Sequence, residues 1–321
     1  MEIALIAFVN YRKSAKLAAI FLPLLVAASL QAPTAHACVI YGEDTRANFS
    51  DLKDPRWKTL AESIPALLNS DLLEDNPKKT DSLQPKDLPT VRYSFGFCKD
   101  EKFSEEPSLT NCSGVLISPH EVLTASHCVL TQNQCDKTRL LFGYYSVDGV
   151  VSTSFPKSDV YSCKSIHHSE NCAFGGCDPD IEIVELDRDV IGRAPLPVTL
   201  PDFATHFEKG FSIVSAGYTL GMPLKFDLDG RVLSDVDHPE FEAALDIGPG
   251  NSGGPVFDAR TGQLIGLTIA GPSKPFALRP FEYDAKNRCF RPMHCPLSGC
   301  DSEQAHVQKI DTELLKLLRG N

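Results

Sequence analysis

The sequence has no long run of basic residues and, beyond its first 37 positions, no long apolar run. Its 31 Lys and Arg residues are outnumbered by 42 Asp and Glu residues, which gives a formal net charge of -11. A chain without clustered cations offers no focused positive field to phosphate groups, so we expect no nucleic acid partner. A membrane span needs roughly 20 apolar residues, and none is expected here. The 42% of hydrophobic residues in 321 predict an ordinary globular core.

Residues 1–37 have the layout of a secretory signal peptide. Basic residues precede the apolar run 17–30, and Ala35-His36-Ala37 forms a small-x-small cleavage site. The apolar run contains Pro23 and is shorter than a spanning helix. We therefore exclude these residues from the fold and expect a secreted or periplasmic protein.

The chain has 11 cysteines, an odd number. In an exported protein cysteines are read first as disulfides, because no thiol pool keeps them reduced. Cys38 would be the first residue after cleavage, and a lipid anchor there would leave ten cysteines for five bridges. Ala35 and His36 are poor residues for a lipoprotein signal, so a lipid anchor and a soluble protein both stay open.

Composition divides the rest of the chain into three parts. Residues 38–90 are rich in Asp, Glu, Lys and Pro, with a helical-looking stretch at 57–68, and they are typical of an N-terminal extension or propeptide. Short β-type runs follow at 91–190 and again, after a Pro-rich stretch, at 191–321. Two groups of short strands predict two small β-barrels.

The last turn-free piece of the sequence has a helical pattern. Residues 303–318 place Val307, Ile310, Leu314 and Leu317 at spacings of three and four. This spacing predicts an amphipathic C-terminal helix over the whole stretch, packed on the body of the protein.

The strongest chemical signal is Gly250-Asn251-Ser252-Gly253-Gly254-Pro255. Glycines permit a sharp bend and the close approach of a substrate backbone. In such a turn the N–H groups of Gly250 and Ser252 converge, which would stabilise the negative charge on a reacting carbonyl oxygen. The alternative interpretation is a simple glycine-rich β-turn.

A serine hydroxyl is a weak nucleophile and needs an imidazole as base. His127 is the candidate, since it directly follows a strand-like segment at 121–124. Cys112 and Cys128 lie 16 residues apart and flank a strand-turn-strand pattern. A bridge between them would clamp the turn that carries the imidazole.

An imidazole that takes a proton is stabilised by a carboxylate on its other nitrogen. Asp180 is the candidate because it precedes the β-type run 181–186. Asp178 is its nearest rival, and a simple capping role is the alternative for either residue.

The order His127, Asp180, Ser252, together with Cys112 and Cys128, resembles the chymotrypsin family of serine proteases over roughly residues 91 to 318. The resemblance implies two six-stranded antiparallel β-barrels, peptide substrates, a serine endopeptidase mechanism with an acyl-enzyme, and no cofactor or metal. We expect a monomer. The chain looks closer to a bacterial secreted branch related to glutamyl endopeptidases, through the stretches 39–44, 97–103, 186–196 and 221–225.

Two departures from the family pattern concern activation. Asn251 stands where animal-type members have an Asp that pairs with a newly cut amino terminus. The basic-Ile-Val-Gly-Gly activation sequence is also missing. We therefore expect an oxyanion site that needs no buried terminal ion pair, while removal of residues 38–90 as a control of access stays open.

The residues that select the substrate are less defined. Asp246, six before Ser252, would attract Lys or Arg in a trypsin-like pocket, or would be a buried residue satisfied by backbone N–H groups. Gly248 replaces the cysteine of the family's pocket disulfide. Ile247 and Thr268 stand where glutamyl endopeptidases have the Thr and the His that bind the acidic side chain of the substrate. The strand from Thr268 to Gly271 would form the pocket wall and pair with the substrate backbone.

Two other functions are compatible with parts of the sequence. A protease homologue without activity would bind peptides or surface partners, although it would normally lack one of the three candidate residues.

A zinc protein would use one of two residue groups, namely His167, His168, Cys172 and Cys177, or Cys289, His294, Cys295 and Cys300. Disulfides are favoured over zinc because exported cysteines oxidise.

Overall fold

The computed structural model describes residues 40–168, 172–173, 176–198, 208–234, 239–271, 281–299, 304–310 and 312–319. The chain divides into two units, Met1–Thr34 and Ala35–Asn321, and all described residues belong to the second. The expected signal peptide and Cys38 lie outside the described residues.

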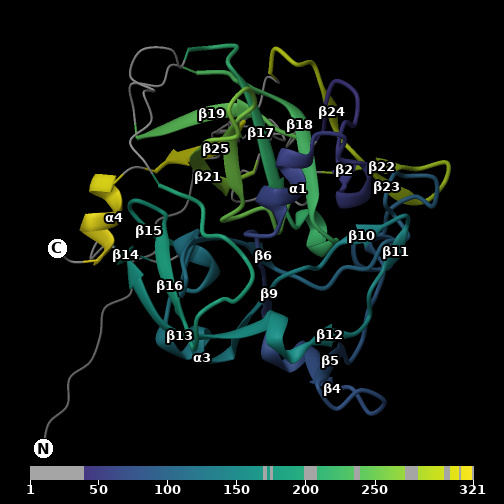
Figure 1. The fold of residues 1–321 in the computed structure, drawn as a ribbon. Helices are drawn as coiled ribbons and strands as arrows, with labels where there is room; N and C mark the ends of the chain where they lie inside the picture. Colours follow the sequence, from purple (N-terminus) through teal and green to yellow (C-terminus); the bar gives the residue numbers. More distant parts are fainter. Residues whose placement is uncertain are drawn as a thin grey trace, which may run out of the picture. The chain divides into compact units, whose positions relative to one another are not determined.

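The first large sheet has seven strands and lies in the lower half of Figure 1. Its order is β6 (Cys112–Ser113), β3 (Ala66–Asn69), β9 (Thr138–Leu141), β13 (Val160–His168), β16 (Glu182–Leu186), β8 (Glu121–Thr124) and β7 (Val115–Ser118). The two end strands, β6 and β7, are separated along the chain by Gly114 alone. The sheet therefore curls back on itself into a nearly closed barrel.

The second large sheet, in the upper half of Figure 1, closes completely. Six strands form the ring, β17 (Ser212–Gly217), β20 (Pro255–Asp258), β21 (Leu264–Ala270), β25 (Ala305–Lys309), β19 (Glu240–Ala244) and β18 (Lys225–Val232). Pairing between β17 and β18 closes it, and β2 (Ala47–Asn48) is added outside on β18. The expected fold of two antiparallel barrels is confirmed.

Alternating side chains give each barrel its own core. Successive residues of a strand point to opposite faces. In β16, Val184 contributes to the apolar cluster inside the first barrel, while the preceding Ile183 joins a cluster that includes Val214 and Phe257 of the second barrel. The same strand thus fills its own barrel and packs against the other, which holds the two barrels together.

The segment before residue 91, expected to be an extension, contributes to both barrels. Its β3 lies between β6 and β9 of the first sheet, and α1 (Pro55–Ala61) places Trp57 against Phe226 and Phe257 of the second. The apolar stretch 57–68 is therefore a short helix followed by a strand rather than one helix. Burial of its side chains against distant strands decides this, since the local pattern is ambiguous for such short runs.

The C-terminal helix is shorter than expected. Residues expected in its first half form β25, which pairs with β19 and β21 and completes the second barrel. Helix α4 (Thr312–Arg319) buries Leu315 and Leu318, while Leu317 is 60% exposed. The spacing of Val307 and Ile310 fits a strand as well as a helix, and pairing on both edges favours the strand.

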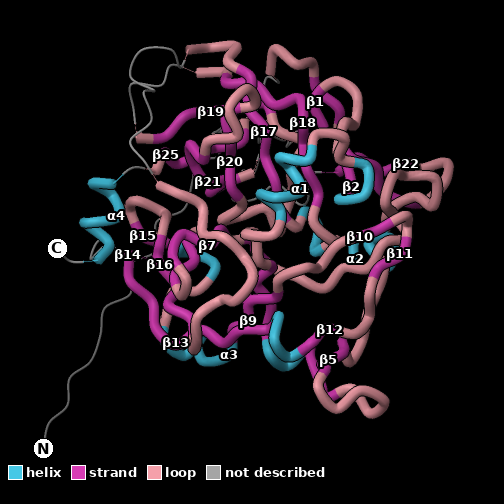
Figure 2. The backbone as a smooth tube through the Cα atoms, in the orientation of Figure 1, coloured by secondary structure: helices cyan, strands magenta, loops and turns pink. Residues whose placement is uncertain are grey.

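Smaller elements surround the barrels. Figure 2 shows that the helices are few and short and lie around the sheets; besides α1 and α4 they are α2 (Val91–Phe95) and α3 (Gln132–Lys137). Short pairings join β1 (Ile40–Tyr41) to β24 (His294–Cys295), β10 (Ser146–Val147) to β11 (Val150–Val151), β14 (Cys172–Ala173) to β15 (Gly176–Cys177), β22 (Phe281–Asp284) to β23 (Cys289–Pro292), and β5 (Ser82–Pro85) to both β4 (Leu73–Asp75) and β12 (Phe155–Pro156).

Three disulfides fasten distant parts of the described chain. Cys112 and Cys128 form the expected bridge. Cys135–Cys163 ties α3 to β13, and Cys98–Cys289 joins segments 191 residues apart. Sequence reasoning had named no partner for Cys98, Cys135 or Cys163, because pairing depends on which cysteines the fold brings within reach.

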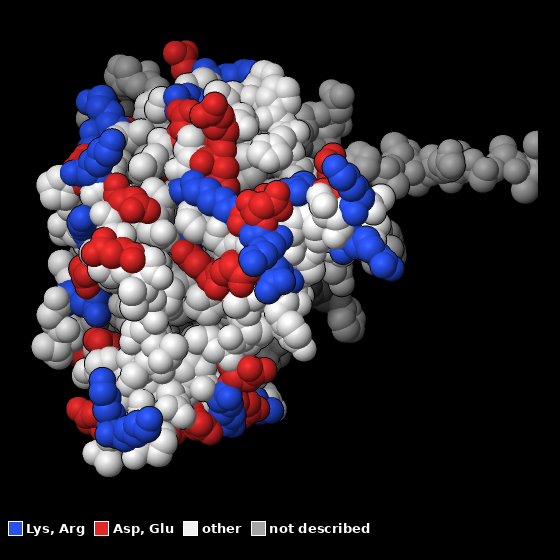
Figure 3. Space-filling model, turned by 90° about the vertical axis from the view of Figure 1, so that its right-hand side faces the viewer, with Lys and Arg blue, Asp and Glu red and all other residues white. Residues whose placement is uncertain are grey.

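The surface drawn in Figure 3 carries basic and acidic side chains next to one another rather than in separate fields. The described part of the chain has no helix that combines the length and the apolar composition needed to cross a bilayer.

Candidate active site

His127 lies on a single helical turn, Ser126–Cys128, that follows β8 directly. The buried residues Thr124 and Ala125 fix the end of the strand, and the disulfide at Cys128 fixes the end of the turn. The imidazole is therefore carried by a segment held at both sides, and its side chain remains 31% exposed.

Asp180 contacts His127 twice. Its Oδ2 lies 2.7 Å from Nδ1 of the imidazole, and its Oδ1 accepts a 3.1 Å hydrogen bond from the backbone N–H of His127. The hydroxyl of Ser126 donates to the same Oδ1. Burial raises the pKa of Asp180, but the hydrogen bonds from His127 and Ser126 outweigh it, so the pKa lies below its ordinary value. Asp178, the rival, has an exposed side chain.

A second carboxyl group lies close to this pair. Glu182, the first residue of β16, is fully buried. Burial, and then the charge of Asp180, raise its pKa to about 10, so it carries a proton at neutral pH. Asp180 is therefore the ionised carboxylate beside the imidazole.

The turn around Ser252 is wedged between the barrels. The N–H of Ser113 in β6 donates to the carbonyl oxygen of Ser252 at 2.8 Å, and the N–H of Gly253 donates to Thr268 in β21 at 2.7 Å. Gly253 has a φ of +80°, and a Cβ atom there would overlap with the carbonyl oxygen of Ser113 and the hydroxyl of Thr124. Only glycine fits this close approach.

The nucleophile turn also contacts the segment that carries the imidazole. The Sγ atom of Cys128 lies 3.7 Å from the carbonyl oxygen of Ser252. His127 is the residue before Cys128, so the disulfide brings the two candidate segments into direct contact.

Two backbone donors at this turn are available to a ligand. Within the described ranges, neither the N–H of Gly250 nor that of Ser252 donates to another group of the protein. Gly250 has a φ of +100°, and its carbonyl oxygen accepts a 2.7 Å hydrogen bond from the hydroxyl of Ser113. That bond fixes the orientation of the turn, which is what a preorganised oxyanion site requires.

Asn251 is held by neutral partners. It is 3% exposed, its Oδ1 accepts a hydrogen bond from the hydroxyl of Thr219, and its N–H donates to Gly248 at 3.1 Å. A buried Asp would need a cation here, whereas an amide is satisfied by a hydroxyl. Sequence reasoning missed Ser113, Ser126 and Thr219, since hydroxyl groups next to a motif carry no signal of their own.

Asp246 is a buried residue that accepts a hydrogen bond from a backbone N–H group, which was the alternative to a pocket residue that attracts Lys or Arg. It is 3% exposed, and its Oδ1 accepts a 2.6 Å hydrogen bond from the N–H of Tyr41 in β1. Its own N–H donates to Oδ2 of Asp227 at 2.8 Å. Burial, and then the charge of Asp227, raise the pKa of Asp246 to about 8. This geometry is that of a structural carboxyl group.

The expected pocket strand is only partly free. Thr268 is 1% exposed, and both its N–H and its carbonyl oxygen bond to the nucleophile turn, through Gly254 at 2.9 Å and Gly253 at 2.7 Å. The backbone N–H and carbonyl groups of Thr268 are therefore already used, and they are not free for the β-type hydrogen bonds to a substrate that the sequence predicted. Gly271, just after β21, is half-buried, and its Cβ position faces open space.

In the second residue group considered for zinc, the one that begins at Cys289, at least one cysteine is not available as a ligand. Cys289 is bonded to Cys98, and a disulfide sulfur is no thiolate donor. Of the first group, the side chains of His168, Cys172 and Cys177 lie outside the described residues.

An imidazole–carboxylate pair from one β-barrel, placed beside a serine turn from a second, is the arrangement of the chymotrypsin fold. Residues 112–267 match the family model of the trypsin-like peptidase domain. The chain thus carries a trypsin-like peptidase domain, and its fold is that of the chymotrypsin-like serine proteases.

Several solved structures are similar to this chain. The VesB protease of Vibrio cholerae matches with 14% identity and a TM-score of 0.50, over 85% of this chain and 64% of that one. The secreted serine protease VesC of Vibrio cholerae matches with 16% identity and a TM-score of 0.47, over 77% and 43%. A Glu endopeptidase in complex with MPD matches with 16% identity and a TM-score of 0.47, over 88% and 98%.

At 14% identity, the likeness to VesB speaks to the fold alone. The chain spans less than two thirds of the length of either Vibrio cholerae protease. The closer resemblance to glutamyl endopeptidases stays a prediction from the sequence.

Proposed function

We propose that this protein is an exported serine endopeptidase that hydrolyses peptide bonds through an acyl-enzyme on Ser252. The observation that carries the proposal is the 2.7 Å contact between Asp180 and His127, on a segment whose next residue touches the nucleophile turn. A carboxylate on one nitrogen of an imidazole leaves the other nitrogen as the proton acceptor.

The proposed reaction has two halves. The hydroxyl of Ser252 attacks the peptide carbonyl while His127 takes its proton, and the N–H groups of Gly250 and Ser252 stabilise the oxyanion. The protonated imidazole then gives its proton to the leaving amine. Water, deprotonated by the same imidazole, releases the acyl group and restores Ser252.

The direct test is replacement of the nucleophile. Ser252→Ala should lower kcat on the order of a millionfold, as in a serine protease of another fold whose triad members act as a unit. Covalent labelling by an organophosphonate, located by peptide mass spectrometry, should modify Ser252 in the wild-type protein alone. Turnover retained by the variant, or a label on another serine, would contradict the proposal.

The alternative is a protease homologue without activity that binds peptides or surface partners. This protein would bind peptides but would neither turn them over nor react with the phosphonate. Peptide binding without a covalent label on Ser252 would favour that function.

Export is part of the proposal. Three disulfides among the described residues support an oxidising compartment. Mass spectrometry of the mature amino terminus tests it, because cleavage after Ala37 gives a chain that begins at Cys38, with or without a lipid. An intact first 37 residues in material from the native host would contradict export by a cleaved signal.

Activation is proposed to need no terminal ion pair, which the neutral surroundings of Asn251 support. Material whose amino terminus is shown to be Cys38 should therefore be active. Complete inactivity of that material would contradict this proposal. Removal of the whole segment 38–90 is not a usable test, because it would take β3 out of the first barrel.

A further inference from the structure

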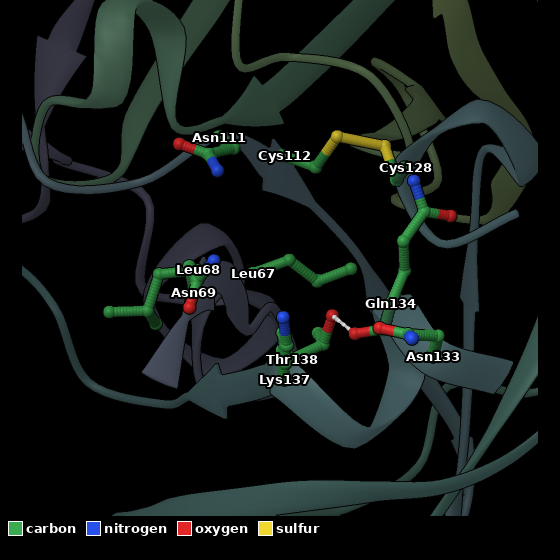
Figure 4. Close-up of a pocket in the computed structure, with 10 residues that line it drawn as sticks. All are labelled: Leu67, Leu68, Asn69, Asn111, Cys112, Cys128, Asn133, Gln134, Lys137 and Thr138. Atoms are coloured by element: carbon green, nitrogen blue, oxygen red, sulfur yellow. Dashed lines mark hydrogen bonds between the residues drawn. A yellow bond between two sulfur atoms is a disulfide. The ribbon is translucent and has the colours of Figure 1, made fainter. Parts of the chain in front are cut away.

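The turn that carries the oxyanion donors is held from two sides. On the side of the first barrel, the hydroxyl of Ser113 donates to the carbonyl oxygen of Gly250 at 2.7 Å, and Ser113 lies next to the disulfide drawn in Figure 4. On the side of the second barrel, the N–H of Leu220 donates to the carbonyl oxygen of Pro249 at 2.5 Å. The site described above does not account for this second contact.

The contact at Pro249 decides where one oxyanion donor points. The peptide unit between Pro249 and Gly250 is trans, so its C=O and N–H bonds point in opposite directions. Because the carbonyl oxygen of Pro249 is directed at Leu220, the N–H of Gly250 is directed away from Leu220. Rotation of this single peptide unit would remove the donor from the oxyanion site.

Leu220 has a backbone conformation that needs support from its surroundings. Its φ is +56°, in the left-handed region that a residue with a Cβ atom disfavours. Such a conformation persists only where neighbouring contacts fix it. The side chain of Leu220 is buried in an apolar cluster that includes Ile40, Val91 and Phe97. We call the three residues Thr219–Gly221 the Leu220 turn.

The segment 106–110 supplies hydrogen bonds to the Leu220 turn. The hydroxyl of Ser108 donates to the carbonyl oxygen of Leu220 at 2.7 Å, and the N–H of Leu109 donates to the carbonyl oxygen of Gly221 at 2.8 Å. A Cβ atom at Gly221 would lie only 2.8 Å from the hydroxyl oxygen of Ser108, so the two segments are in close contact. A displacement of segment 106–110 therefore moves the Leu220 turn with it.

A buried ion pair fastens segment 106–110 to the second barrel. Nζ of Lys225 lies 2.5 Å from Oε2 of Glu106, and the two side chains are 2% and 16% exposed. The same ammonium group donates to the carbonyl oxygen of Pro223 at 2.9 Å and lies 4.6 Å from the centre of the Phe103 ring. Lys225 is the first residue of β18, so the pair joins the segment to the start of that strand.

The charges of this pair depend on each other. Burial lowers the pKa of Lys225 to about 8, and the charge of Glu106 opposes that effect. Arg46 and Asp51 also act on Lys225, with opposite signs. Removal of one partner of a buried pair leaves an uncompensated charge, which disturbs its surroundings far more than the loss of a surface pair does. A single substitution here should therefore displace the segment.

We propose that Lys225 and Glu106 are positioning residues for the oxyanion site, and that this internal ion pair takes the place of the terminal ion pair that Asn251 cannot form. The pair acts through segment 106–110 and the Leu220 turn and does not touch the substrate. The inference rests on the proposed endopeptidase function and names what holds one of its oxyanion donors in place.

Lys225→Gln tests the pair, and Arg193→Gln is the matched control. Arg193 is also a largely buried cation, 12% exposed, and it pairs with Glu62 and Asp159. Among the described residues it makes no hydrogen bond to the Leu220 turn or to the turn around Ser252. The two variants thus make the same change in charge and differ in what the lost cation holds.

The kinetic result should separate the two variants. Lys225→Gln should lower kcat by about 10- to 100-fold, part of the effect of losing a whole oxyanion donor, and leave KM within about twofold. Arg193→Gln should keep the kcat of the wild type. Equal losses of kcat in the two variants, or an unchanged kcat in Lys225→Gln, would overturn the proposal.

Glu106→Gln breaks the same pair at its more exposed end, and it replaces Lys225→Gln if that variant does not fold. The double variant of Lys225→Gln with Glu106→Gln should lose no more kcat than the single variants, because the two residues act as one unit. A purely structural role would lower the unfolding temperature and leave the kcat of the folded protein unchanged. That outcome, or independent losses that multiply, would contradict the proposal.

Hydrogen exchange separates this inference from the proposed function, because it needs no turnover. The N–H groups of Leu220 and Leu109 should exchange about tenfold faster in Lys225→Gln than in the wild type, and at the wild-type rate in Arg193→Gln. Unchanged exchange in Lys225→Gln would refute the role of the pair even in an active peptidase. If the wild type neither hydrolyses peptides nor reacts with the organophosphonate, the endopeptidase function fails, and faster exchange would still support the hold of the pair on the Leu220 turn.

Discussion

The backbone N–H of Tyr41 donates a 2.6 Å hydrogen bond to Oδ1 of Asp246, a residue 205 positions further along the chain. Tyr41 belongs to β1, which pairs in parallel with β24 in a separate two-stranded sheet, so this hydrogen bond ties the start of the described chain to the residue that follows β19 and Leu245 of the second barrel. The carboxyl group that sequence reasoning considered as a substrate selector is thereby engaged with the protein itself.

Stability should depend on pH through Asp246. Its pKa is raised to about 8 in the folded protein from an ordinary value of 3.8. Between these values the unfolded chain has lost the proton and the folded chain keeps it, so stability falls as pH rises, by up to about 1.4 kcal/mol per pH unit. Asp246→Asn, measured by denaturant unfolding from pH 4 to 9, should lack this contribution. Parallel pH profiles of the two proteins would contradict it.

The pH experiment compares matched surroundings. Asp227, Asp44, Arg46 and Tyr41 face Asp246 in both proteins, and Glu182 lies elsewhere and is unchanged. The titration of Glu182 therefore cancels in the difference between wild type and variant, whereas Asp227 and Asp246 repel each other and titrate together, so the difference reports this buried pair.

Substrate choice should be nearly independent of Asp246. At 3% exposure its carboxyl group offers little to a Lys or Arg side chain. Asp246→Asn should therefore leave the relative kcat/KM of peptides with Lys, Glu, Leu or Ala before the cut within about twofold, in line with small effects from groups that do not touch the substrate. Selective loss of Lys cleavage would restore Asp246 as selector.

Asp180 should be needed for turnover and not for folding. In related enzymes the matching Asp→Asn change favours the wrong imidazole tautomer and lowers kcat about 10⁴-fold. We expect a similar loss in Asp180→Asn, with thermal unfolding still cooperative. Asp178→Asn is the control on an exposed neighbour, and kcat that falls equally in both variants would count against the assigned roles.

Two disulfides should separate stability from activity. Removal of Cys112–Cys128, which closes 16 residues, costs about 3 kcal/mol in the chain-entropy model. It should also lower kcat, because Cys128 contacts Ser252. Removal of Cys98–Cys289, which closes 191 residues, should cost about 5 kcal/mol in the same model. Folded material of this second variant should keep its kcat, and a comparable drop would refute the distinction.

Gly253 should tolerate no side chain. Gly253→Ala combines a left-handed backbone with overlap against Ser113 and Thr124, and we expect a loss of about 3 kcal/mol or more. Gly192→Ala is the matched control, since Gly192 has the same φ of +80° but open space around its Cβ position. It should cost only about 1–2 kcal/mol, the backbone part of the effect. Equal losses in unfolding measurements would show that the overlap is relieved.

Local patterns in the sequence were sufficient for features that depend on neighbouring residues. The glycine-rich turn at Ser252, the strand before His127 and the strand after Asp180 are each visible within a few positions. The choice of Asp180 over Asp178 also rested on that short range, and the contact with His127 agrees with it.

Only the tertiary structure decided features that depend on distant contacts. Residues 305–309 became a strand because β19 and β21 each offered a free edge, and β3 joined the first barrel because β6 and β9 flank it. The bond between Tyr41 and Asp246 and the partner of Cys98 depend likewise on segments that are far apart in the chain and lie outside the two barrels' own strands. A short apolar run fits a helix or a strand almost equally well, so hydrogen bonds and burial supplied from far along the chain determine which one forms.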